Sequence, residues 1–102
     1  MILVIESDEI YRSLIVEIVK TFSSIPVLGA ANIVEATVAL THNPQLIVVN
    51  YLNFVQIYPQ IKDRRYVVIS AVCRSGEGIT KDNFIMKEKL VAELPKWLKS
   101  AK

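Results

Sequence analysis

The sequence predicts an α/β fold in which a doubly wound, five-stranded parallel sheet carries helices on both faces. Two observations lead to this prediction. Short, wholly apolar runs alternate with amphipathic segments along the chain, and the run Leu46–Val49 has the continuous apolar pattern of a strand buried on both faces. Right-handed connections between parallel strands then place helices on both sides. The 102 residues, 52% of them hydrophobic, are expected to form a single domain spanning 1–102.

The first part of the chain contains two strand–helix units. Ile2–Ile5 is an apolar strand, and a helix from about Asp8 to Phe22 follows it. Val27–Ala31 is the second strand, and Pro26, which cannot donate to a sheet ladder, favours a place for it at the sheet edge. The second helix runs from Ile33 to Thr41 after a pair resembling a capping box. Helical spacing assigns the buried face of the first helix to Ile10, Leu14, Ile15, Ile18, Val19 and Phe22.

The middle of the chain contains the third and fourth strands. Asn50 lies just past the carboxyl end of the third strand, Leu46–Val49. The next segment, Asn53–Asp63, contains Pro59 and is predicted to form only one or two helical turns, because proline removes a helix hydrogen bond. Tyr66–Ile69, β-branched and apolar, is the fourth strand.

The last third of the chain is predicted to contain a loop, a short strand and a helix. Val72–Asn83 has two glycines and little periodicity, so it is expected to be a loop. Phe84–Met86 is the fifth strand. An amphipathic segment begins at Leu90, and Pro95 fits it if the regular helix begins near Ala92 or later, where proline is tolerated.

Placing the second strand at an edge favours the strand order 2-1-3-4-5, the flavodoxin-like arrangement. Ligands in such sheets bind at the carboxyl ends of the strands. Polar residues follow four different strands at that end and are expected to share one shallow crevice: Glu6 and Ser7, Asn50, Ser70, and Lys87.

Composition excludes several classes of function. The net charge is only +2 and the basic residues are spread along the chain, so no nucleic-acid footprint is expected. The single cysteine, Cys73, rules out an internal disulfide and a cysteine-based zinc site, and is predicted to be buried. No apolar run is long enough to span a membrane or to act as a signal peptide, which leaves a cytoplasmic protein by elimination. The chain has no Ser/His/Asp set, glycine-rich phosphate loop or metal cluster, so neither an enzyme nor a cofactor or metal site is expected.

In the order and spacing of these pieces the chain resembles the receiver domain of two-component response regulators, the CheY-like family. The matching pieces are ILVIESDE, PQLIVVN, VVISA and FIMK. The resemblance implies that Glu6 and Ser7 occupy the positions of the acidic pair that holds Mg²⁺, and that Asn50 occupies that of the phosphoacceptor aspartate. Ser70 and Lys87 match the hydroxyl and the lysine that bind the phosphoryl group, and Phe84 matches the aromatic switch residue.

Two departures from the family pattern remove its chemistry. Asn50 carries a neutral amide, a far poorer nucleophile than a carboxylate, and Ser7 replaces a carboxylate with a hydroxyl. Lys87 is expected to pair with Glu6 as a structural ion pair. The intervals between Asn50, Ser70 and Lys87 are shorter than in the family, so the third and fourth helices are expected to be shortened.

The sequence therefore favours a stand-alone, degenerate pseudo-receiver that takes part in signalling through phosphorylation-independent contact with a protein partner or as a homodimer. The expected contact surfaces are the last strand, the final helix and the aromatic segment after Asn50. The alternative is a sensor of a small anion or other small ligand, which would use Lys87, Ser70 and the Asn50 amide in the crevice.

Overall fold

The structure, a computed structural model, describes residues 1–99 and contains a five-stranded parallel sheet in the order β2-β1-β3-β4-β5. The predicted fold class and strand order are confirmed, with β2 at one edge. The strands are β1 (Ile2–Ile5), β2 (Val27–Ala30), β3 (Leu46–Asn50), β4 (Tyr66–Ser70) and β5 (Phe84–Met86).

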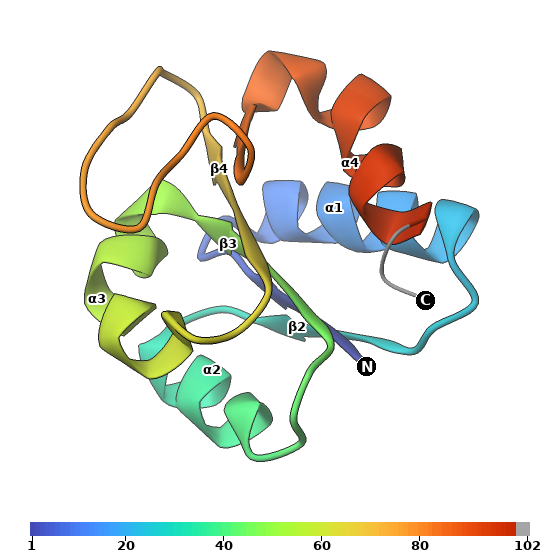
Figure 1. Ribbon diagram of the computed structural model, residues 1–102. Coiled ribbons are helices and arrows are strands. Elements are labelled where there is room, and N and C mark those ends of the chain that lie inside the picture. Colours follow the sequence, from blue (N-terminus) through green and yellow to red (C-terminus); the bar gives the residue numbers. More distant parts are fainter. Residues whose placement is uncertain (100–102) are drawn as a thin grey trace.

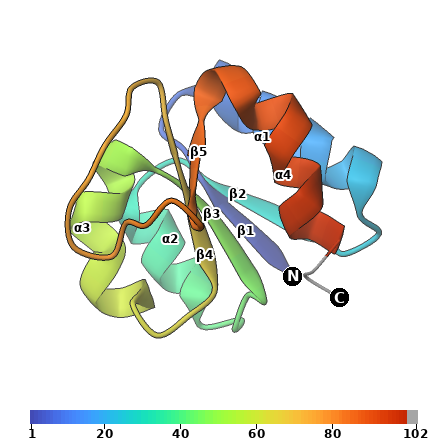
Figure 2. The same cartoon turned by 45° about the horizontal axis from the view of Figure 1, so that its top comes forward.

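The helices form two layers around the sheet (Figures 1 and 2). α1 (Glu9–Phe22) and α4 (Leu90–Lys99) cover one face, whereas α2 (Ile33–Leu40) and α3 (Tyr51–Ile61) cover the other. Alternate strand residues face the two layers: Ile2 packs with α1 and α4, and Leu3 packs with α2 and α3. Both residues are fully buried, as expected for a strand covered on both sides.

The buried stripe of α1 is narrower than its sequence predicts. Ile15, Ile18 and Val19 are buried, but Ile10 is 82% exposed and Leu14 is 43% exposed. A helix turns by about 100° per residue, so Ile10 and Leu14 point well away from the direction of Ile15. Phe22, which has the right direction, is half exposed because it is the last residue of the helix.

Two helices continue through a proline, contrary to prediction. α3 contains Pro59 and has 11 residues, instead of one or two turns. α4 begins at Leu90, directly after a 3₁₀ turn, so Pro95 lies in its interior and not in its first turn. The carbonyls deprived of a partner belong to the residues four positions earlier, Val55 and Val91. Both valines are more than half exposed, so water can hydrogen-bond these carbonyls.

The segment between β4 and β5 contains no helix. Residues 71–83 form a loop, as predicted. The helix that the resemblance implies between β4 and β5, expected to be shortened, is therefore replaced by this loop. The loop lies beside α3 (Figure 2). Cys73, predicted to be buried, is exposed because it lies in this loop, outside both helical layers.

Gly78 fixes the loop against α3. Its backbone has φ +82°, and a Cβ at this position would lie 2.5 Å from Cε1 of Tyr58. The Gly78 carbonyl accepts hydrogen bonds from the Tyr66 hydroxyl and, at 2.9 Å, from Nδ2 of Asn83. Tyr58 and Tyr66 form an aromatic cluster with Phe54, in which the centroids of Phe54 and Tyr58 are 5.1 Å apart. The loop is therefore tied to the α3 side of the sheet.

Candidate functional site

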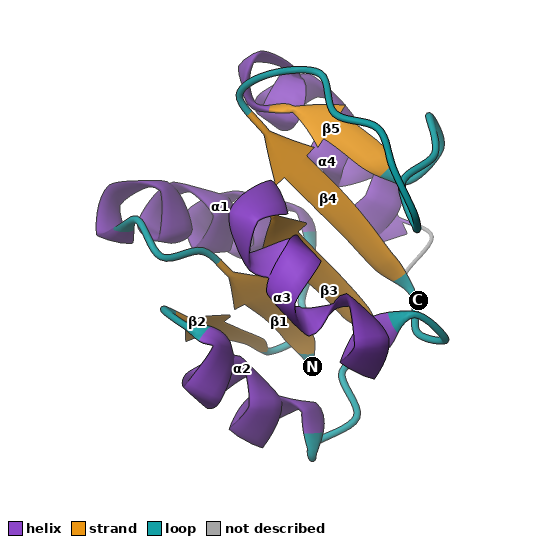
Figure 3. Cartoon of the chain, turned by 90° about the vertical axis from the view of Figure 1, so that its left-hand side faces the viewer, coloured by secondary structure: helices purple, strands orange, loops and turns teal. Residues whose placement is uncertain are grey.

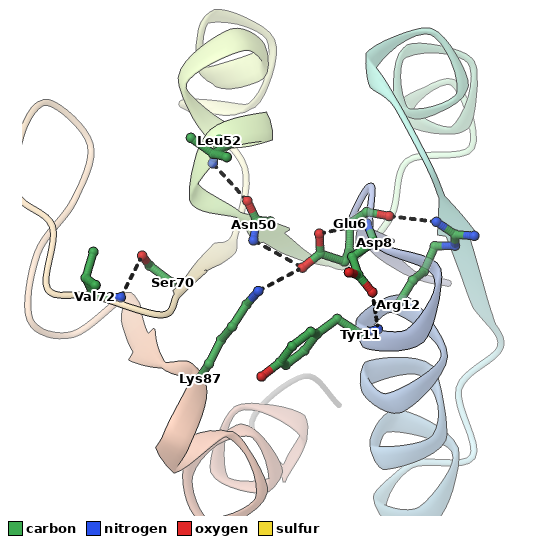
Figure 4. Close-up of polar contacts among 9 residues, drawn as sticks. All are labelled: Glu6, Asp8, Tyr11, Arg12, Asn50, Leu52, Ser70, Val72 and Lys87. Carbon is green, nitrogen blue, oxygen red and sulfur yellow. Dashed lines mark hydrogen bonds and ion pairs between the residues drawn. The ribbon is translucent and has the colours of Figure 1, made fainter.

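The polar residues at the carboxyl ends of the strands are organised around Glu6, whose side chain is only 2% exposed (Figure 4). Its Oε1 accepts a hydrogen bond from Nδ2 of Asn50 at 3.1 Å and lies 3.6 Å from Nζ of Lys87. Its Oε2 accepts from the backbone N–H of Asp8 at 3.2 Å. A buried carboxylate is thereby balanced by one cation and two hydrogen-bond donors, which offset the cost of removing it from water.

Asn50 uses both ends of its amide. The Nδ2 group donates to Glu6, and Oδ1 accepts from the backbone N–H of Leu52 at 2.9 Å. The second contact makes Asn50 the N-cap of α3, which satisfies one of the free N–H groups at that helix end. An aspartate could cap the helix in the same way, but an ionised aspartate could not donate to Glu6.

Lys87 approaches Glu6 from the end of β5. Its side chain is 17% exposed, and Nζ lies 3.9 Å from the centroid of the Tyr11 ring as well as beside Glu6. The predicted ion pair between Lys87 and Glu6 is therefore present. The gross attraction of such a pair is about 4 kcal/mol at 4 Å and an effective dielectric near 20, and desolvation removes much of it.

The other residues implied by the resemblance serve local structure. Ser7 is exposed, and the N-cap of α1 is Asp8, whose Oδ1 accepts from Tyr11 N at 3.0 Å. Ser70 is buried at the end of β4, and its Oγ accepts from Val72 N at 3.3 Å. Phe84 is half buried and packs against the core cluster on the α2–α3 side.

Four residues of the site were not identified from the sequence: Asp8, Tyr11, Arg12 and Arg74. Arg12 donates through Nη1 to the Glu6 carbonyl at 2.9 Å, and its side chain crosses the backbone at Gly29. Asp8, the N-cap of α1, and Arg12, in its first turn, closely follow Glu6 in the sequence, and this proximity is a signal that indicates them.

A pocket of about 170 Å³ opens beside this network. Asn50, Ser70, Lys87 and Arg74 line it together with neighbouring loop residues. The Arg74 guanidinium carbon lies 4.6 Å from the centroid of the Tyr51 ring, and Lys87 is paired with Glu6. Both cations at the pocket therefore already have partners within the protein.

The Mg²⁺ ion that the resemblance implies does not fit this donor set. Glu6 is the only carboxylate of the buried network. Both of its oxygens accept hydrogen bonds, and the Lys87 ammonium group lies beside Oε1. Mg²⁺ is normally held through one or two free carboxylates in near-octahedral geometry. Within residues 1–99, no group of three or more His, Cys, Asp and Glu side chains is placed to share a metal ion.

The fold is that of response-regulator receiver domains. A response regulator from Thermotoga maritima superposes with a TM-score of 0.75 at 18% identity, over 98% of this chain and 94% of that chain. A response regulator receiver domain protein from Bacillus halodurans gives 0.73 at 12% identity, over 99% and 95%. A LuxR-family DNA-binding response regulator from Staphylococcus aureus gives 0.73 at 17% identity, over 98% and 97%.

No family model matches the sequence, and no curated protein does. The similarity to receivers therefore concerns the fold, which is found in domains that serve signalling and regulation. None of the helices between residues 1 and 99 is long and apolar enough to cross a membrane.

Proposed function

We propose that this chain is a non-enzymatic pseudo-receiver that acts in signalling or regulation through contact with another protein, without being phosphorylated. The observation that carries the proposal is the double use of the Asn50 amide. Where receivers have a nucleophilic carboxylate, this chain has a neutral group already engaged by Glu6 and by the N-terminus of α3.

The Glu6–Lys87 pair supports the same proposal. In the receiver pattern, the lysine binds the phosphoryl group. Here its Nζ lies 3.6 Å from a buried carboxylate and 3.9 Å from the centre of an aromatic ring. An incoming phosphoryl group would have to compete with Glu6 for this cation, and separating the pair would leave a buried carboxylate without its counter-charge.

A small-anion sensor is the alternative, and the presence of Lys87 and Arg74 on one pocket favours it. An anion there would have to draw both cations away from Glu6 and Tyr51. Thermal stabilisation by phosphate that Lys87→Ala abolishes would identify this function.

The direct test is incubation with Mg²⁺ and acetyl phosphate, or with Mg²⁺ and beryllium fluoride. Intact mass reports phosphorylation, and the NMR signal of the Asn50 side-chain amide reports binding. Trp97 fluorescence is a poor reporter, because Trp97 packs against Arg65, next to the start of β4 and therefore at the opposite end of the sheet. We expect no change in mass and no saturable shift; a phosphorylated species would contradict the proposal.

The double variant Asn50→Asp/Ser7→Asp is the matched comparison. It restores the two carboxylates that the receiver pattern requires, and Mg²⁺ binding by this variant alone would show that these two residues remove the chemistry. Failure of the double variant to bind Mg²⁺ would show that the Glu6–Lys87 pair and the shorter connections have also remodelled the site.

A further inference from the structure

Charged side chains are distributed very unevenly along this chain. Of the 12 basic and 10 acidic residues, only Glu35 lies between Lys20 and Lys62. This interval builds β2, α2, β3 and α3. Since β3 is interior, the surface of this interval consists of α2, α3 and the edge strand β2, and Glu35, exposed on α2, is the one Asp, Glu, Lys or Arg that the interval contributes to it.

Within this surface, three aliphatic side chains form an exposed ridge beside the sheet edge. Val34 and Val38, one turn apart on α2, are 75% and 62% exposed, and Leu28 on β2 is 43% exposed. Together with Glu35, His42 and neighbouring residues they line a groove of about 330 Å³ between β2 and α2. We take this ridge at the sheet edge as a candidate contact surface.

The backbone of β2 is also open on its outer side (Figure 3). Ile2 N donates to Pro26 O at 2.8 Å and Glu6 N donates to Ala30 O at 3.0 Å, so the even-numbered residues of this strand turn towards β1. In a parallel ladder the intervening residues point the other way. Val27 and Gly29 therefore direct their N–H and C=O groups away from the sheet.

The two sheet edges differ in how they are protected. β5 is followed at once by Lys87, Glu88 and Lys89, and charges of this kind discourage pairing between edges. β2 has no charged residue in its sequence or within several positions of either end, although the Arg12 side chain of α1 crosses the strand at Gly29. β2 is therefore the edge available to another strand.

The geometry points to a symmetric dimer of this chain, in which β2 pairs antiparallel with β2 of a second copy and the two α2 helices pack side by side. A two-fold axis perpendicular to the sheet joins the edges and keeps both α2 helices on the same face, running in opposite directions. Val34 of one copy then approaches Val38 of the other. The dimer rests on the proposed function, because it names a second copy as the protein that is contacted.

Charge favours a second copy as the occupant. A symmetric contact sets this surface against itself, and because Glu35 is the one Asp, Glu, Lys or Arg that residues 21–61 contribute to it, the basic residues behind the net charge of +2 lie elsewhere in the sequence. Nucleic acid or an anionic membrane would need basic groups on the same surface, and residues 21–61 contain no lysine or arginine.

Sedimentation velocity over a wide range of concentration tests the dimer, with Val38→Glu as the disruptive variant. Val91→Glu is the matched control, because Val91 is 65% exposed on α4, on the opposite face. We expect wild type and Val91→Glu to dimerise, and Val38→Glu to associate about a hundredfold more weakly, because it buries an unpaired charge. A monomeric wild type, or a Val38→Glu variant that dimerises normally, would overturn the dimer.

Hydrogen exchange tests the strand pairing itself. The outward amides of Val27 and Gly29 should exchange fast in dilute samples and become protected as the concentration rises. Dimerisation without that protection would refute the β2 contact. The dimer and the proposed function can fail separately: a monomer would still lack phosphorylation, and a phosphorylated protein could still dimerise.

Discussion

Replacing Asn50 with aspartate perturbs the Glu6 network directly while preserving the N-cap of α3. The substitution removes the Nδ2 donor that lies 3.1 Å from Glu6 Oε1, and it retains an oxygen for the Leu52 amide. A hydrogen bond to a charged group contributes about 1.5–3 kcal/mol. Two carboxylates about 4 Å apart add gross repulsion of about 4 kcal/mol at an effective dielectric near 20, part of which Lys87 offsets.

Protonation limits this penalty. The introduced carboxyl group can bind a proton, and at pH 7 this costs about 4 kcal/mol for a group whose ordinary pKa is about 3.9. We therefore expect Asn50→Asp to lower the free energy of unfolding by about 3 kcal/mol at pH 7. Repulsion from Glu6 raises the pKa of the introduced carboxyl in the folded state. The loss of stability should accordingly be small near pH 4 and increase as the pH rises towards that folded-state pKa.

Urea unfolding followed by circular dichroism, at several pH values and with a chelator present, measures this difference. Asn50→Ala is the control, because it removes the same donor and the cap without adding a charge, so its loss of stability should fall less in acid than that of Asn50→Asp. If Asn50→Asp is as stable as wild type at pH 7, or if its deficit does not shrink at low pH, the Asn50 amide does not hold Glu6 as described.

Two further predictions concern the loop 71–83. Gly78→Ala should lower the free energy of unfolding by about 2–4 kcal/mol, because it combines a positive φ with a clash at Tyr58. Gly76→Ala, with φ +141° and nothing within 4 Å, should cost only the backbone strain of about 1–3 kcal/mol, with no added clash. Burial, together with Tyr58, raises the pKa of Tyr66 above its ordinary value of 10.0. The contribution of the neutral hydroxyl to the free energy of unfolding is therefore complete below pH 10 and is lost as the pH rises further. Tyr66→Phe should remove that alkaline loss, and an unchanged alkaline profile in urea titrations would contradict this assignment.

The sequence was sufficient for the sheet because strands buried on both faces leave a clear pattern. Leu46–Val49 is wholly apolar and wholly buried, and Pro26 correctly indicated the edge strand. The prolines of α3 and α4 were misleading, since the cost of an interior proline depends on whether the freed carbonyl is exposed. That exposure follows from how each helix sits on the sheet, which local sequence does not specify.

The residues of the site also fall into two groups, those that the sequence could place and those that it could not. Glu6, Asn50 and Lys87 could be brought together from the sequence because each follows a parallel strand, and such strands end at one edge. The contributions of Tyr11 and Arg74 depend on the rotation of α1 and on the path of the loop 71–83. Neither has a periodic signal, so neither could be placed before the fold was known.

The Glu6 network and the proposed β2–α2 contact surface together suggest how such a protein would be regulated. Glu6 links the carboxyl ends of β1, β3 and β5 through two hydrogen bonds and one ion pair. Moving one of these segments would leave the buried carboxylate without one of its partners. If the chain is not phosphorylated, as we propose, phosphorylation cannot be the event that shifts its conformational equilibrium. Dimerisation through β2 would instead respond to the amount of protein by mass action. A regulator of this kind would be controlled by its concentration, and its output would not change when a kinase is added.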